Sequence, residues 1–244
     1  MKLWLIIRHQ IRLFSKTLNI LVLLIAAPLF LIFTFGQAFS AIWDKGGFDF
    51  RALDYFGITL LTLVVFNGAQ IASWGIHKEK KSNTETRLSL APIKKDTVLF
   101  GTFLGTWIIL SLLTFLLVFL AHFILSVDYG PSIGPVLLLL AAETLLAVSL
   151  GVSLAFLLQE KAANALLQSL IPLICFLGGC YAMIPESGVL HSVSFISPLR
   201  WVNLALMASA RGGDNRYLLP ALLFCAGLSA LFLALTGIRL RRHS

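Results

Sequence analysis

The sequence His77-Lys-Glu-Lys-Lys-Ser-Asn-Thr-Glu-Thr-Arg-Leu-Ser-Leu-Ala-Pro-Ile-Lys-Lys-Asp96 is the most polar stretch of its length in an otherwise oily chain. Long apolar runs flank it on both sides. Such a segment cannot lie in the hydrocarbon of a bilayer, where each central charge costs about 2.5–3.5 kcal/mol on insertion scales. Its excess of lysine and arginine predicts that it lies in water on the cytoplasmic side of a membrane.

The composition points the same way. Of the 244 residues, 58% are hydrophobic and only 12% are charged, whereas about a quarter of the residues of a soluble domain are charged. The formal charge of +8 sits at the edges of apolar runs, so membrane topology explains it better than nucleic-acid binding. The cysteines, Cys175, Cys180 and Cys225, lie in or beside apolar runs without a CxxC motif, and we expect them to be packing residues.

Apolar runs of about 20 residues predict transmembrane helices. The sequence therefore predicts an all-α membrane protein with a single transmembrane domain over residues 1–244. Residues 2–16 alternate basic and apolar faces at helical spacing, which predicts an amphipathic helix lying on the inner leaflet. The six predicted spans cover about residues 18–42, 55–76, 98–125, 134–158, 165–184 and 218–238.

Residues 185–216, between the fifth and sixth spans, are mildly polar but hold many apolar side chains. Ser197-Pro198 is typical of an N-cap followed by proline at the first helical position. Residues 202–210 can continue that helix, and Gly212-Gly213 can end it. We therefore expect short helices that lie at the outer membrane surface or dip into it.

The distribution of lysine and arginine predicts the orientation. With the N-terminus inside, the cytoplasmic segments hold most of the basic residues, including the six of the loop 77–96 and the arginines after the last span. This asymmetry predicts that both termini are cytoplasmic.

Some polar residues fall inside the predicted spans. Glu143 lies within the fourth span, and an intramembrane carboxylate is a functional candidate by default. The alternative is a protonated or hydrogen-bonded packing group. Asn67, Gln70 and Ser73 recur at three-residue spacing, so they either bond to neighbouring helices or line a transport path.

Motifs for catalysis are absent from the sequence. It contains no GxxxxGK[ST] loop for binding ATP, no HExxH, no GxSxG and no paired metal-ligand pattern. We therefore predict no catalytic residue, no cofactor site and no metal site in this chain.

Three segments resemble the type-2 ABC transporter permeases. Glu79 with Lys80-Lys81, then Thr84-Glu85, Arg87-Leu88 and Pro92, is similar to that family's "E-K-x-x-x-T-x-E-x-L…P" loop. Residues 173–185, LICFLGGCYAMIP, are similar to the end of its fifth span, although Gly178-Gly179 stands where Ser-Gly is commoner. Ser197-Pro198-Leu199-Arg200-Trp201 is similar to the segment before its sixth span, and the six-span order matches over the whole chain.

The resemblance implies partners and a mechanism. Such permeases pair as homodimers or heterodimers in the cell membrane and bind two cytoplasmic ATPase subunits, which hold the ATP and magnesium. Closure of those subunits pushes on the loop 77–96 and on the amphipathic start, and a path opens between the permease halves. The resemblance implies ATPase contacts at Glu79, Lys80, Lys81, Glu85, Arg87, Leu88, Pro92, Arg8 and Arg12. The candidate path or gate residues are Asn67, Gln70, Glu143, Phe176, Tyr181, Ser197, Pro198, Arg200 and Trp201.

The function implied is export of an amphiphilic or hydrophobic compound from the cytoplasm or inner leaflet, with a drug or antimicrobial favoured. A lipid-linked glycan is an alternative cargo. The alternative class is an ion-coupled secondary transporter with Glu143 as its proton site, but such proteins usually show repeated halves, and this sequence shows no such repeat. An intramembrane enzyme would need a nucleophile or metal set that is absent from the sequence.

Overall fold

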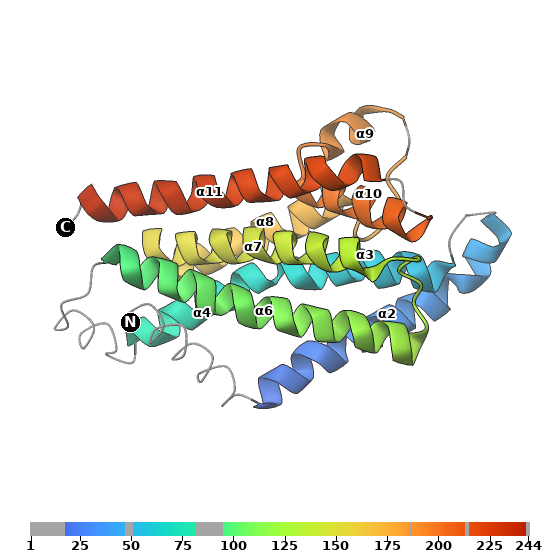
Figure 1. Ribbon diagram of the computed structural model, residues 1–244, viewed down its shortest axis with the longest axis horizontal. Coiled ribbons are helices and arrows are strands. Elements are labelled where there is room, and N and C mark those ends of the chain that lie inside the picture. Colours follow the sequence, from blue (N-terminus) through green and yellow to red (C-terminus); the bar gives the residue numbers. More distant parts are fainter. Residues whose placement is uncertain (1–17, 47–50, 82–94, 186, 213–214, 243–244) are drawn as a thin grey trace.

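The computed structural model describes residues 18–46, 51–81, 95–185, 187–212 and 215–242 (Figure 1). Within these ranges the protein is helical, without any strand, and six helices are long and apolar enough to cross a membrane. The predicted all-α membrane fold with six spans is therefore confirmed. The amphipathic start, 2–16, and most of the loop 77–96 lie outside the described residues.

The helices follow one another with short connections. In chain order they are α2 (Leu18–Gly46), α3 (Ala52–Phe66), α4 (Gly68–Lys81), α6 (Lys95–Leu125), α7 (Ile133–Leu157), α8 (Glu160–Gly178), α9 (Val189–Ser194), α10 (Pro198–Ala210), the 3-10 turn η1 (Asn215–Tyr217) and α11 (Leu218–Arg242).

Helix α7 is the centre of the bundle. It packs against α3, α4, α6, α10 and α11, and 72% of its span is buried, against 17% for α2 and for α11. Its closest approach is to α4, because a Cβ added at Gly151 would meet the backbone carbonyl of Ala69. Small residues at a crossing let two backbones touch, which is a common way to hold helices together in lipid.

The second span consists of two helices rather than one. The prediction of a continuous span over 55–76 is wrong in this respect, because α3 ends and α4 begins around Asn67. The Asn67 backbone N–H and its side-chain Nδ2 both donate to the carbonyl of Leu63, at 3.1 and 2.8 Å. This local bonding competes with the regular helical ladder, as asparagine side chains commonly do.

Helix α8 begins and ends earlier than the predicted 165–184. It ends in a left-handed Gly179 with φ of +78°. The Gly179 N–H donates to Phe176 O at 3.0 Å and the Cys180 N–H to Cys175 O at 3.0 Å. This pair of bonds is a Schellman motif, which closes a helix and turns the chain away from its axis. Residues 180–185 therefore leave the helix and reach the outer segment.

The predicted short helices between the last two spans are present. Helix α10 begins at Pro198 after the N-cap position Ser197 and ends before Gly212, which has a φ of +114°. The Ser197 hydroxyl does not cap α10 but donates to Ile174 O of α8 at 2.8 Å. Helices α9 and α10 lie at the end of the bundle opposite the C-terminal ends of α4 and α11 (Figure 1).

Candidate outer binding cavity

A buried asparagine joins three elements next to the outer segment. Asn203 of α10 is 1% exposed. Its Nδ2 donates to Gly178 O at 2.9 Å and lies 3.5 Å from Cys180 Sγ, while its Oδ1 accepts from the Thr62 hydroxyl of α3 at 2.9 Å. We call these four residues the Asn203 hub. It fixes α10 and the end of α8 against α3.

Tyr55 makes a second bond to the same turn. It lies in the first turn of α3, and its hydroxyl donates to Gly179 O at 3.0 Å. Its ring packs edge-on against Phe56 and, in a tilted arrangement, against Trp43 at a centroid distance of 5.0 Å. The turn after α8 is therefore held by backbone acceptors on both of its glycines.

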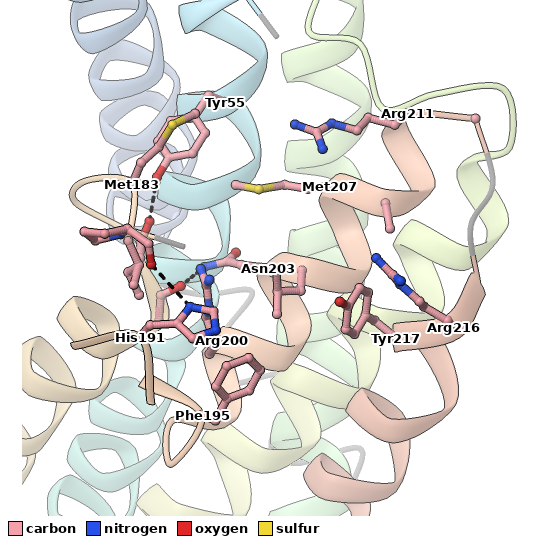
Figure 2. A pocket seen from close by; sticks show the side chains of 17 residues that line it. Tyr55, Met183, His191, Phe195, Arg200, Asn203, Met207, Arg211, Arg216 and Tyr217 are labelled. Atoms are coloured by element: carbon pink, nitrogen blue, oxygen red, sulfur yellow. Dashed lines mark hydrogen bonds between the residues drawn. The ribbon is translucent and has the colours of Figure 1, made fainter. Parts of the chain in front are cut away.

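A cavity of about 1060 Å³ opens beside this turn. Its walls come from the first turn of α3, the residues after α8, α9, α10 and η1 (Figure 2). Four basic side chains line it, namely those of His191, Arg200, Arg211 and Arg216. The size is at the upper end of the range typical of small-molecule sites.

One face of α10 forms a long wall of the cavity. The wall residues recur three or four positions apart, which is the spacing of a single helical face. Figure 2 shows the side chain of Met207 between those of Asn203 and Arg211. The members of this face that line the cavity are Arg200, Asn203, Leu204, Met207, Ala208 and Arg211.

Arg200 is the most buried cation of the cavity. It lies in the first turn of α10, and its Cζ is 5.9 Å from the ring centroid of Phe195. Burial lowers the pKa of the Arg200 guanidinium from its usual value. Its Nε is buried and has no hydrogen-bond partner among the described residues. His191, on the same wall, contacts Pro185 O through Nδ1 at 3.2 Å.

A separate clamp orders the loop between α6 and α7 at this end of the bundle. Arg51 donates to both carboxylate oxygens of Asp54, at 2.7 and 2.8 Å, and to Ser126 O at 2.8 Å. Asp54 in turn accepts from the Asp128 N–H at 2.9 Å. The hydrogen bond to Asp54 raises the pKa of the Arg51 guanidinium. This clamp holds the start of α3 in register with the loop.

Glu143 lies in the middle of α7, remote from these bonds. It is 1% exposed, and neither carboxylate oxygen has a hydrogen-bond partner among the described residues. The titratable groups close enough to interact with it electrostatically include the thiols of Cys180 and Cys225. All three cysteines are buried and free. The described part of the chain holds no group of His, Cys, Asp and Glu residues able to bind a metal.

The structure separates the predicted path residues into three sets. Arg200 lines the outer cavity. Buried or half-buried residues in helix contacts are Ser197, Pro198, Trp201, Asn67, Gln70 and Glu143, while Phe176 and Tyr181 are exposed. Trp201 donates through Nε1 to Phe195 O at 3.1 Å and so holds the start of α10. These positions are not gathered around one common space among the described residues.

The sequence analysis missed most of the cavity wall. Asn203, Arg211, Arg216, Tyr55 and His191 were not among the candidate residues. The spacing of Arg200, Asn203, Met207 and Arg211 along one predicted helix is a signal that could have found the α10 wall. Nothing in the sequence signals that Tyr55 meets the turn after α8, because 124 residues separate them.

The predicted ATPase contacts lie at or beyond the edge of the described structure. Glu79, Lys80 and Lys81 belong to the last turn of α4, and α6 begins at Lys95. The residues Glu85, Arg87, Leu88, Pro92, Arg8 and Arg12 lie outside the described residues.

Six membrane-length helices, polar contacts that join them in the interior and an outer cavity define a multi-pass membrane protein of the transporter kind. Residues 45–238, well over half of the chain, match the family described as ABC-2 family transporter protein. The chain belongs to this family, and it is a permease subunit rather than a catalytic one. A search of curated proteins found no match.

Proposed function

We propose that this permease exports an amphiphilic or hydrophobic compound, in a complex with a second permease subunit and two separate ATPase subunits. The observation that carries the cargo class is the outer cavity, whose lining combines cationic side chains with Met183, Phe195 and Met207. A purely polar solute would leave that apolar wall without a partner. Among amphiphiles, a drug or antimicrobial compound is the favoured cargo, with a lipid-linked glycan as the second candidate.

The coupling element is the loop 77–96. Its first residues extend α4 and its last residues begin α6, and both helices pack on the central α7. A push on the loop would therefore reach the core through two rigid helices. We propose that residues 84–90 form about two helical turns capped by Ser82 or Asn83 and ended by Pro92, with Arg87 and Leu88 facing the ATPase.

The test is the variant Glu85→Ala/Arg87→Ala/Leu88→Ala, which keeps every lysine and hence the topological signal. We expect normal insertion, weakened recovery of the ATPase subunit and loss of transport. Thr86→Ala/Ser89→Ala in the same loop is the matched control and is expected to transport normally. Wild-type binding and transport by the triple variant would show that the loop only anchors the topology.

The proposed orientation has both termini in the cytoplasm. Cysteines introduced at Ser82 and Ser244 are expected to react with an impermeant reagent only from the cytoplasmic side, and one at Ser132 only from outside. The native cysteines are buried, so background labelling is expected to be low. Labelling of position 82 from outside intact cells would overturn this topology.

Family membership separates the chain from ion-coupled secondary transporters, the alternative class. The choice of cargo is tested with the reconstituted complex by measuring ATPase stimulation across compound classes. We expect amphiphilic drugs to stimulate hydrolysis and sugars without an apolar part to have no effect. Stimulation by lipid-linked glycans alone would establish the second candidate instead.

A further inference from the structure

The outer cavity is cationic to a degree that packing alone does not require. Its arginines come from two elements, α10 and η1, yet all three line one space (Figure 2). None of the 17 described residues that line it is acidic. Glu186 and Asp214 adjoin lining residues in the sequence but lie outside the described residues, so both enter the test below.

Arg200 is unfavourably placed for the stability of the fold. It lies in the first turn of α10, where the positive end of the helix macrodipole disfavours a cation. Its buried Nε lacks an acceptor among the described residues, and a buried charged donor without an acceptor is costly. The contact with the Phe195 ring supplies some attraction but no hydrogen bond. An anionic oxygen entering the cavity would supply the missing acceptor.

The rest of the wall fits an apolar group next to that anion. Met183, Ile184, Leu204 and Met207 face the same space as the arginines. The neighbouring outer segment carries exposed apolar side chains, with Val189 82% and Ile196 72% exposed. Such side chains beside basic residues suit the interfacial depth of a bilayer, where headgroups and the first part of acyl chains lie.

We propose that the cavity between α8, α9 and α10 binds the anionic headgroup of an amphiphile, with Arg200 as the buried contact and Arg211 and Arg216 at the rim. A guanidinium presents paired donors that match phosphate or carboxylate oxygens. The apolar wall takes the adjoining tail. This inference gives the cargo of the proposed function a headgroup chemistry and rests on that function for its meaning in transport, whereas binding requires the permease alone.

The first experiment measures binding to the purified full-length permease without its ATPase. The probes are a fluorescent short-chain phosphatidylglycerol, the matched zwitterionic phosphatidylcholine, and inorganic phosphate as competitor. We expect the anionic lipid to bind at least about tenfold more tightly than the zwitterionic one, as a charge-assisted contact to a buried arginine would give. Equal binding of the two lipids would overturn the proposal. Competition by phosphate at equal concentration would identify a phosphate site without a role for the tail, contrary to the proposal.

The second experiment uses variants of the same protein. Arg200→Gln is expected to remove the preference for the anionic lipid, and Arg200→Lys to keep part of it. Arg239→Gln, a matched change at the exposed end of α11, is expected to leave binding unchanged. If Arg200→Gln does not fold, the exposed pair Arg211→Gln/Arg216→Gln decides, with an expected loss of about threefold or more. Wild-type preference in these variants would overturn the proposal.

Two further arms separate this inference from its neighbours. Glu186→Gln and Asp214→Asn are expected to strengthen or leave unchanged the binding of the anionic lipid, and a loss of binding would show that these carboxylates, rather than the arginines, form the site. In the reconstituted complex, Arg200→Gln is expected to reduce ATPase stimulation by anionic amphiphiles. Full transport with no anion preference would refute the cavity proposal and leave the exporter function standing, whereas failure of the coupling-loop variant to affect transport would do the reverse.

Discussion

Asn203 and Glu143 are buried to the same extent, 1% exposed each, but they are satisfied very differently. Asn203 bonds to groups from α3 and from the end of α8. Glu143 has no hydrogen-bond partner among the described residues, although it lies in the helix that the others pack against.

The difference separates two uses of polarity in a membrane interior. The Asn203 hub ties elements together, because an amide without partners would be costly in this environment. Glu143 contributes no hydrogen bond to this arrangement of helices, so the fold alone gives no reason for its presence. Intramembrane carboxylates of this kind are functional candidates, and Glu143 is best explained by a second conformation or by contact with cargo.

Loss of the hub is expected to have the largest effect. Asn203→Leu removes the bonds to Thr62 and Gly178 and leaves both groups buried without that partner. Interhelical hydrogen bonds in membranes average about 0.6 kcal/mol and reach about 1.7 kcal/mol, so we expect a loss of about 2 kcal/mol in the free energy of unfolding in mixed micelles. Asn164→Leu, the same change at a half-buried site of α8, is the control and is expected to change little. Equal effects of both would show that the hub has no special role.

Glu143→Met is expected to have the opposite sign. Replacing an unsatisfied polar group by an apolar one of similar shape is neutral or stabilising, so we expect a gain of about 1 kcal/mol in the free energy of unfolding. Transport by Glu143→Gln is expected to fall with expression intact. Wild-type transport together with a loss of stability would show that Glu143 is a satisfied packing group and would erase the contrast with Asn203.

Tyr55→Phe tests a single bond beside the hub. It removes the hydroxyl that donates to Gly179 O while keeping the ring in its aromatic contacts. We expect a loss of about 0.6 kcal/mol in unfolding free energy, the average for one such bond. Tyr181→Phe, at an exposed position, is the control. A loss as large as that of Asn203→Leu would mean that the turn after α8, rather than the hub, carries the stability of this region.

The smallest effect is expected for Arg51→Gln. Arg51 makes as many printed bonds as the Asn203 hub, but its side chain is 60% exposed. Exposed ion pairs contribute about 0.2–1 kcal/mol and are screened by salt, so we expect a loss of about 0.5 kcal/mol that shrinks at 1 M salt. A larger, salt-independent loss would show that burial is not what distinguishes the hub.

The sequence was sufficient for features set by local chemistry. Long apolar runs predicted the six spans because a bilayer demands them, and Ser197-Pro198 predicted the start of α10 because proline suits the first helical position. The break at Asn67 was not predicted, since an asparagine inside a span can equally bond to a neighbouring helix. The early end of α8 follows from Gly179, a signal that the apolar run through 180–184 obscured.

The candidate site was predicted only in part. Arg200 was named from its motif, whereas Asn203, Tyr55 and Thr62 meet through contacts between residues far apart in sequence. Such contacts depend on how helices pack, and no local pattern encodes them. The partly correct result for Arg200 and the failure for Tyr55 have the same physical origin, because the motif marks a helix start but not what that helix faces.

The central position of α7 also sets an order of assembly. Helices α2, α3, α4 and α6 precede α7 in the chain, so they enter the membrane before the helix they pack against has been made. Thr62 waits longer still, because Asn203 follows it by 141 residues. At about 5–20 residues per second, that interval is roughly 7–28 s of synthesis. During it the threonine must be satisfied by its own helix, as the 2.8 Å contact of its hydroxyl with Thr59 O allows. A nascent chain stopped after α6 is therefore expected to be inserted but easily digested by protease, and resistance is expected to appear only once α10 has emerged.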